Sequence, residues 1–183
     1  IHNRSGVTLS MKNLVGCMPL DVYKDPLYNN RESYVHGQDY WRRVSRMIMD
    51  LNTAIPIHFC LVDGVIGREK DAGTWTPGSA PVESRLILAG RNAVATDAVA
   101  TSLMGHNPAA QYPNPPFING QSHLLIADNL GLGPSSLGDV QVVLEEGYTL
   151  DGLTTYFQPP DPNNDVPPDF VPDPPVPPIP ELS

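Results

Sequence analysis

The sequence predicts one acidic α/β domain over residues 1–157, built as a layered, partly parallel sheet with flanking helices, and an extended proline-rich arm over residues 158–183. Apolar runs of strand length alternate with segments of helical spacing, as in α/β proteins. Of the 183 residues, 40% are hydrophobic and 17% are charged, which is enough apolar material for one core. In contrast, 11 of the 21 prolines lie between Pro159 and Pro180, so the last residues cannot join that core as a helix or a central strand.

The first half of the domain contains two predicted strands around one predicted helix. Residues 7–11 alternate as a strand does, and the polar residues 20–38 predict a long loop. From Asp39 onward apolar residues recur at helical spacing, which predicts an amphipathic helix that ends before Pro56. Residues 57–64 are mostly apolar and stop at Asp-Gly, as expected of a strand buried on both faces of a sheet.

The second half repeats this alternation after a long glycine-rich loop over residues 65–83. The sequence here predicts a strand over residues 85–90 and a helix over residues 92–104. A second helix is predicted over residues 122–130 and a last strand over residues 140–144. Gly105 is expected to end the first of these helices, and the intervening proline-rich residues 106–120 predict a surface excursion. The order of strands and helices favours a sheet that is at least partly parallel.

Composition excludes several classes of protein. The net charge of -9 and the isoelectric point near 4.8 argue against nucleic-acid binding, which usually requires a basic face. No apolar run approaches the 18 residues of a transmembrane helix. Cys17 and Cys60 cannot form a zinc or iron–sulfur site by themselves. Each is expected to be a buried free thiol, and a disulfide between them stays open for an exported protein.

Several motifs occur in the order that is typical of one known family: Lys12-Asn13-Leu14-Val15-Gly16, His36, Leu61-Val62-Asp63-Gly64-Val65, the run from Leu88 to Ala100, Met104-Gly105 and Gly131-Leu132-Gly133. On these motifs the chain resembles the bacterial and archaeal domain-of-unknown-function family 362 over most of residues 7–145. The resemblance implies an α/β protein that is often exported, which favours a periplasmic or extracellular location. Some family members carry a ferredoxin-like module, but no iron–sulfur cluster is expected from this chain. The chain also lacks the usual N-terminal portion of the family, so we expect the protein to be longer than this sequence.

Asp63, Glu69 and His36 are the first candidate site. A carboxylate at the C-terminal end of a parallel strand points into the crevice where open α/β sheets bind ligands. Glu69 follows Asp63 in the same predicted loop, and together with His36 these side chains could bind a divalent metal ion or act as an acid–base pair. The structural alternative is that Asp63 starts a turn and that Glu69 is solvated.

Lys12, Asn13 and Asp97 are the second candidate site. A cation beside an amide at a strand end can bind a carboxylate or phosphate group, and Asp97 could add an oxygen ligand. The alternatives are that Lys12 pairs with a nearby acid, that Asn13 caps its own turn, and that Asp97 lies in the first turn of a helix. His106 and His123 flank the proline-rich excursion at a separation that matches no ligand motif.

The proline-rich arm suggests a role in assembly. Such a segment prefers the polyproline II conformation, and its apolar residues are candidate anchors on a partner: Phe170, Val171, Val176 and Ile179. A disordered tail or spacer is the alternative. We therefore expect an accessory or interaction module, a subunit of a larger assembly or a homo-oligomer, that docks through its arm. The alternative function is a metal- or anion-binding enzyme with a strand-end site around Asp63.

Overall fold

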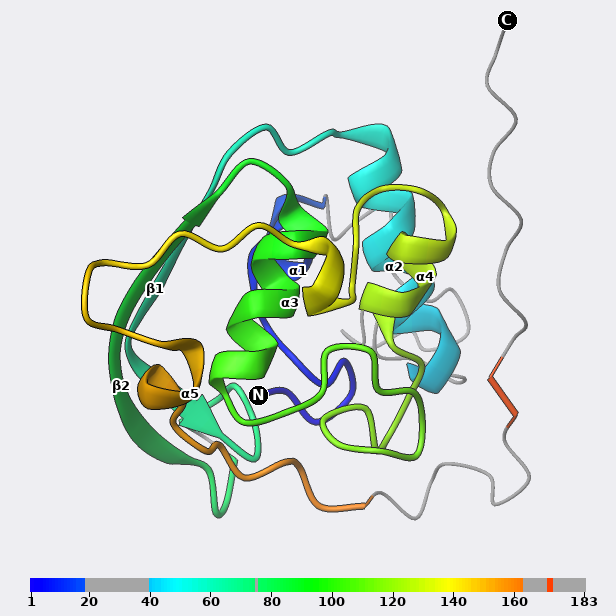
Figure 1. Ribbon diagram of the computed structural model, residues 1–183. Helices are drawn as coiled ribbons and strands as arrows, with labels where there is room; N and C mark the ends of the chain where they lie inside the picture. The colour runs from blue at the N-terminus through cyan, green and yellow to red at the C-terminus, as the bar shows by residue number, and fades with distance from the viewer. Residues whose placement is uncertain (19–39, 75, 163–170, 173–183) are drawn as a thin grey trace, which may run out of the picture.

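A computed structural model describes residues 1–18, 40–74, 76–162 and 171–172 (Figure 1). Their elements are α1 (Ser10–Asn13), the 3-10 helix η1 (Leu14–Cys17), α2 (Tyr40–Ala54), β1 (Cys60–Glu69), β2 (Ala80–Gly90), α3 (Ala93–Leu103), α4 (His123–Asn129), the 3-10 helix η3 (Leu137–Asp139) and α5 (Leu150–Leu153). The mixed α/β class predicted from the sequence is confirmed. The predicted loop over residues 20–38 lies outside the described residues, as does Asp39, where the first helix was predicted to begin.

The described sheet is a pair of long antiparallel strands rather than a partly parallel layer. β1 and β2 pair from Cys60 opposite Gly90 to Glu69 opposite Ala80. The strands are antiparallel because residues 70–79 return the chain directly beside β1, whereas a parallel pair needs a longer crossover. The sheet forms an outer layer beside α3, with α2 and α4 on the opposite side of that helix (Figure 1).

β1 is longer than the sequence predicts because Asp-Gly does not end it. The register instead shifts between Gly64 and Ile66, and β1 continues to Glu69. The Val65 amide donates to the Asp63 carboxylate over 3.0 Å, and the Ser84 hydroxyl donates to the Gly64 carbonyl over 2.7 Å. These two bonds satisfy backbone groups at the irregularity, so the predicted loop over residues 65–83 shrinks to 70–79.

Two of the predicted strands are absent. The prediction over residues 7–11 is wrong, because the chain turns into α1 at Ser10 and the first amides of that helix find an acceptor in Asp97. The prediction over residues 140–144 is also wrong. That segment is extended, but within the described chain none of its backbone groups pairs with a strand.

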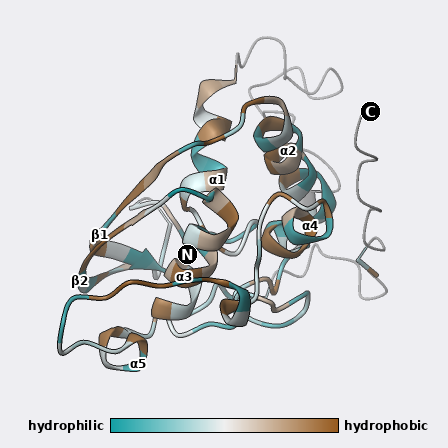
Figure 2. Cartoon of the chain, turned by 45° about the horizontal axis from the view of Figure 1, so that its top comes forward, coloured by the Kyte–Doolittle hydropathy of each residue, from teal (hydrophilic) through white to brown (hydrophobic). Residues whose placement is uncertain are grey.

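The predicted helices are confirmed by α2, α3 and α4. Asn92 caps α3 by accepting a hydrogen bond from the Ala95 amide (2.9 Å), and Ser122 caps α4 in the same way. Gly105, with a φ of +79°, follows the last turn of α3, as expected of a left-handed helix end. Figure 2 shows that α2 is amphipathic, and its apolar face enters the core.

The core lies between the helices rather than under the sheet. Its members come from the N-terminal segment, α2, α4 and the loop before α4, and several are fully buried: Val7, Met11, Val44, Ile48, Leu124 and Phe117. Cys60 is buried at the edge of this core, whereas Cys17 is exposed, so the expectation of a buried thiol is wrong for Cys17. Both cysteines are free thiols.

Residues 155–157 fasten the chain after α5 to the end of α3. The Thr155 amide donates to the Leu103 carbonyl (2.9 Å), and the Phe157 amide donates to the Met104 carbonyl (3.1 Å). The His106 ring bonds the Phe157 carbonyl over 2.8 Å. Because Phe157 is also only 3% exposed, this segment is part of the core.

The first residues of the predicted arm lie on the domain. The Lys70 amide donates to the Gln158 carbonyl (2.9 Å), and the Asn119 side chain donates to the Asp161 carbonyl (2.9 Å). Of the proposed anchors, Val171 is described and 73% exposed, whereas Phe170, Val176 and Ile179 lie outside the described residues. Of the helices that the structure describes, none is long and apolar enough to cross a membrane.

Replacing Gly6 by alanine should destabilise the fold more than a comparable change elsewhere. Gly6 has a φ of +75°, and an added Cβ would lie 2.5 Å from the ring of Phe117, which is 1% exposed and cannot move away. We expect a loss of about 2–3 kcal/mol in the free energy of unfolding, measured by urea denaturation. Gly131→Ala is the control, because Gly131 has a φ of +72° but nothing within 4 Å of an added Cβ. Equal losses in the two variants would contradict the packing argument.

Candidate functional site

Asp97 joins α3 to α1 in the interior of the domain. Its side chain is fully buried, and its two carboxylate oxygens accept hydrogen bonds from the Ser10 and Met11 amides, each over 2.9 Å. Burial raises the pKa of Asp97 to about 7, and the hydrogen bonds from Met11 and Ser10 oppose this rise. The carboxylate therefore holds the first turn of α1 and has no free oxygen directed at a ligand cavity.

Lys12 follows these two amides in α1 and faces Asp71. Burial lowers the pKa of Lys12, and the negative charge of Asp71 opposes the shift. Burial by itself would raise the pKa of Asp71, but the overall shift is downward. The Ala72 and Asn3 amides and the Thr76 hydroxyl donate hydrogen bonds to its carboxylate, and the nearby His2 adds a favourable electrostatic effect. The pairing of Lys12 with a nearby acid stays a prediction that this electrostatic influence of Asp71 favours, and Asn13 is exposed at the end of α1.

His123 is the group in this region that sequence reasoning did not select. Its ring is fully buried, packs edge-on against Phe117 with centroids 5.8 Å apart, and has no hydrogen bond from either nitrogen to the described residues. Burial and then the positive charge of Lys12 lower its pKa to about 3, against a smaller effect of the Ser5 backbone. His123 is therefore neutral at physiological pH. The sequence signal was its place in an apolar helix immediately after the cap Ser122.

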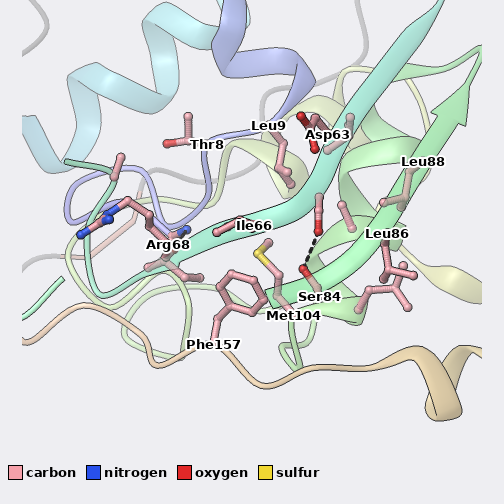
Figure 3. A pocket seen from close by; sticks show the side chains of 17 residues that line it. Thr8, Leu9, Asp63, Ile66, Arg68, Ser84, Leu86, Leu88, Met104 and Phe157 are labelled. Atoms are coloured by element: carbon pink, nitrogen blue, oxygen red, sulfur yellow. Dashed lines mark hydrogen bonds between the residues drawn. The ribbon is translucent and has the colours of Figure 1, made fainter. Parts of the chain in front are cut away.

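The first cavity lies between the inner face of the sheet, the end of α3 and Phe157 (Figure 3). Its volume is about 240 Å³. Asp63 and Arg68 both line it, but Figure 3 places Asp63 near Leu9 at one end and Arg68 at the other. The Arg68 guanidinium donates to the hydroxyl and the carbonyl of Ser79, over 3.1 and 2.9 Å. This cavity is therefore a mainly apolar space with one acidic and one basic end.

Asp63 and Glu69, the two predicted metal ligands that the structure describes, are not brought together. Asp63 and Glu69 are six residues apart on one strand, so their Cα atoms are separated by about 20 Å. The Glu69 carboxylate accepts a hydrogen bond from the Gln158 amide over 2.9 Å. His36 lies outside the described residues, and over residues 1–18, 40–74, 76–162 and 171–172 no three His, Cys, Asp or Glu side chains are grouped suitably for a metal ion.

The second cavity is larger and lies at the free edge of β2. It has a volume of about 510 Å³ and is enclosed by β2, by α3, by residues 139–144 and by Leu150 and Leu153 of α5. Most of its lining is aliphatic, with Arg91, Asn92 and Asp139 among the polar members. Neither cavity is lined by Lys12, Asp71, Asp97 or His123. These buried polar groups therefore lie apart from both cavities, which open around the sheet.

The outer face of the sheet exposes large apolar side chains. Leu61 is 68% exposed, Ile66 62% and Ile87 70%. Leu61 pairs with Ala89, and Asp63 pairs with Ile87, so Leu61 and Ile87 share one face of the two strands, whereas Ile66 lies beyond the register shift, opposite Glu83. Figure 2 shows hydrophobic residues along the sheet and polar residues toward the end of β1. The sequence did not predict this face, because the apolar run over residues 57–64 suggested a strand buried on both faces.

The stability of the protein should fall as the pH rises toward neutrality because of Asp97. The pKa of Asp97 is about 7 in the folded protein and 3.8 ordinarily. Between about pH 4 and pH 7 the folded protein therefore retains a proton on Asp97 that the unfolded chain has released. This contribution is complete below pH 4, is lost as the pH rises to 7, and is at most about 4 kcal/mol. Asp97→Asn removes the titration, so urea denaturation from pH 4.5 to 7.5 should give a flatter profile. Asp50→Asn, at an exposed carboxylate, should retain the wild-type profile, and an unchanged slope in Asp97→Asn would contradict the assignment.

Comparison with known proteins gives a family. The family model described as domain of unknown function DUF362 matches residues 1–102, from the N-terminal segment into the last turn of α3. The matched region includes α1 with Lys12, both strands and Asp97. No curated protein and no solved structure matches the chain. Because the match covers more than half of the 183 residues, the chain belongs to the DUF362 family.

Proposed function

We propose that this chain is an accessory or interaction module that joins a larger protein assembly through the outer face of its β1–β2 sheet. The observation that supports it is the exposure of Leu61 and Ile87 on that face, 68% and 70%, and Ile66 beyond the register shift of β1 is also 62% exposed. Scattered apolar residues are ordinary on a protein surface, but neighbouring large ones on a sheet face are typical of interaction sites. Covering them would remove apolar area from water at roughly 25 cal/mol per Å².

The polar residues on this face support a protein partner. The Arg85 guanidinium forms an ion pair with Glu83 over 2.7 Å, and both side chains are exposed. This pair lies on β2 beyond Ile87, where it can form a hydrated rim beside the apolar centre. An apolar centre with a polar rim is the usual composition of an interface between proteins that also exist separately.

The proline-rich arm would supply a second contact with the same assembly. Its sequence favours polyproline II, and Phe170, Val171, Val176 and Ile179 are its proposed anchors. The partner is either another protein or a second copy of this chain. The layered, partly parallel sheet predicted from the sequence is part of the same proposal, because a partner's strands could extend the sheet beyond β1 and β2.

Polar substitution of the sheet face should release the chain from its assembly. We expect the tagged full chain to purify from its native cells in a complex much larger than its own 19.9 kDa, as measured by light scattering. Leu61→Ser with Ile87→Ser should shift most of the protein to the monomer mass, because the change removes apolar contact without altering buried residues. If the purified wild type forms a dimer alone, the partner is a second copy.

Two further variants complete this test. Ile55→Ser is the matched control, because Ile55 is 51% exposed but follows α2 rather than lying on the sheet, and it should leave the complex intact. Deleting residues 163–183 keeps the segment that bonds Lys70 and Asn119 and should weaken assembly through loss of the arm. Full assembly of both the double-serine variant and the truncated chain would refute the proposal.

A metal- or anion-binding enzyme with a site around Asp63 is the second candidate function. It is favoured by one observation, that Asp63 and Arg68 line the same cavity of about 240 Å³. Elemental analysis of the purified full chain tests it. For this function we expect about one divalent ion per chain in the wild type and loss of that ion in Asp63→Ala, because a carboxylate is a preferred ligand of such ions. Equal metal content in the two proteins would exclude a metal site at Asp63.

A further inference from the structure

The second cavity is a groove with an extended chain on each side. One wall is residues 86–90 of β2, and the other is residues 140–144. Its floor is the face of α3 that carries Ala95, Val99 and Leu103, among other residues. A groove floored by small and aliphatic side chains and walled by extended backbone has the layout of a sheet from which a strand is missing.

β2 has an unpaired edge along this groove. In an antiparallel pair, alternate residues direct their N–H and C=O groups away from the neighbouring strand. Within the part of the chain that the structure describes, no backbone hydrogen bond joins β2 to any segment except β1. The groups of residues 86–90 that face away from β1 are therefore available to another strand.

The other half of the β2 edge is protected. Pro81 has no N–H to donate, and the register shift opposite Gly64 and Ile66 places Arg85 at a φ of +57°, which interrupts regular pairing. Proline and bulges are the usual devices that block edge-to-edge association of sheets. Here these devices end where the groove begins, which leaves residues 86–90 as the accessible part of the edge.

The second wall has the alternation of a strand but no pairing. Val142 and Leu144 are half-buried, whereas Val143 is 85% exposed. Among the described residues, the backbone groups from Gln141 to Leu144 make no hydrogen bond. This explains why the strand prediction over residues 140–144 failed. The side-chain pattern of a strand is present, but no segment that the structure describes pairs with it.

We infer that this groove receives an extended segment of the partner protein, which adds to the free edge of β2 with alternate apolar side chains on the floor of α3. This inference rests on the proposed role in assembly and identifies one element of the partner. A second folded copy does not suit the site, because residues 140–144 bound the groove on its far side. The proline-rich arm of another copy does not suit it either, because proline cannot donate to the β2 edge.

A strand-forming peptide tests the inference on the full chain. The probe is a fluorescent nine-residue peptide of alternating threonine and valine with a lysine at each end, and its control carries N-methyl groups on the valines. Fluorescence polarisation should show binding of the probe and at least tenfold weaker binding of the control, since N-methylation removes the backbone donors of one edge. Amide hydrogen exchange should slow in residues 86–90 when the probe binds. Absence of binding, or equal binding of both peptides, would overturn the inference.

Variants locate the peptide and separate this inference from the proposed function. Ala95→Trp fills the floor of the groove and should weaken binding at least tenfold, whereas Ala54→Trp, at an exposed alanine at the end of α2, should not. Unchanged binding to Ala95→Trp would place the peptide elsewhere and overturn the inference. The comparison of the two peptides uses the wild type, so it stays decisive if Ala95→Trp does not fold. Leu61→Ser alone, at a residue of β1 that does not line the groove, should bind the probe normally, whereas Ile87 lies on the wall of the groove. If the double-serine variant and the truncated chain lose assembly but the wild type does not bind the peptide, only the groove is refuted. If the wild type binds the peptide but both of these variants assemble fully, only the proposed route of assembly is refuted.

Discussion

The carboxylate of Asp97 links two parts of the chain that are far apart in sequence, and the core is arranged around that link. A four-residue helix cannot be stable by itself, because it has more unsatisfied amides than internal hydrogen bonds. By accepting from Ser10 and Met11, Asp97 satisfies two of those amides inside the protein. The turn so fixed places Met11 in the core and directs Lys12 toward Asp71. The Asn52 side chain then donates to the Met11 carbonyl over 2.9 Å, which adds α2 to the same arrangement.

The domain therefore has two regions with different physical character. The helical side is closely packed and contains buried polar groups, of which Asp97 and His123 are the clearest examples. The sheet side has cavities along its inner face and apolar side chains on its outer face. The second region has less internal packing of its own, which is the property expected of a surface completed by a partner. Under the proposed function, the parts of the chain that stabilise the fold and the surface that binds the partner lie on opposite sides of α3.

Local patterns in the sequence predicted the helices well. The spacing of Trp41, Val44, Ile48 and Leu51 is a direct consequence of one buried helix face, and α2 has that face. Asn92 and Gly105 likewise report the local backbone at the two ends of α3. The strands were predicted less well, because an apolar alternating run shows only that a segment can pair. Residues 140–144 have the run, but no strand among the described residues pairs with them, so the prediction failed on a non-local condition.

The candidate site was harder to predict for the same reason. Asp63, Glu69 and Lys12 were chosen as polar residues near expected strand ends, but β1 extends past Asp63 and separates the two carboxylates along one strand. Asp97 was recognised as a candidate ligand, yet its partners are backbone amides 86 and 87 residues away, which leave no trace in the sequence. Family membership adds no chemistry, since the function of DUF362 domains is itself unknown.

The attachment of residues 155–158 has a consequence for how the arm could act. Thr155 and Phe157 bond the end of α3, Gln158 bonds Lys70 just after β1, and the Asp161 carbonyl accepts from Asn119 in the loop before α4, so the start of the arm is held on the domain as far as that loop. A partner held by the arm would consequently stay tethered to the domain even when contact with the sheet face breaks. Its effective concentration there would be set by the length of the arm, in the millimolar range for a short linker. Two individually weak contacts would then give an avid complex that still exchanges partners readily when only one of them is lost.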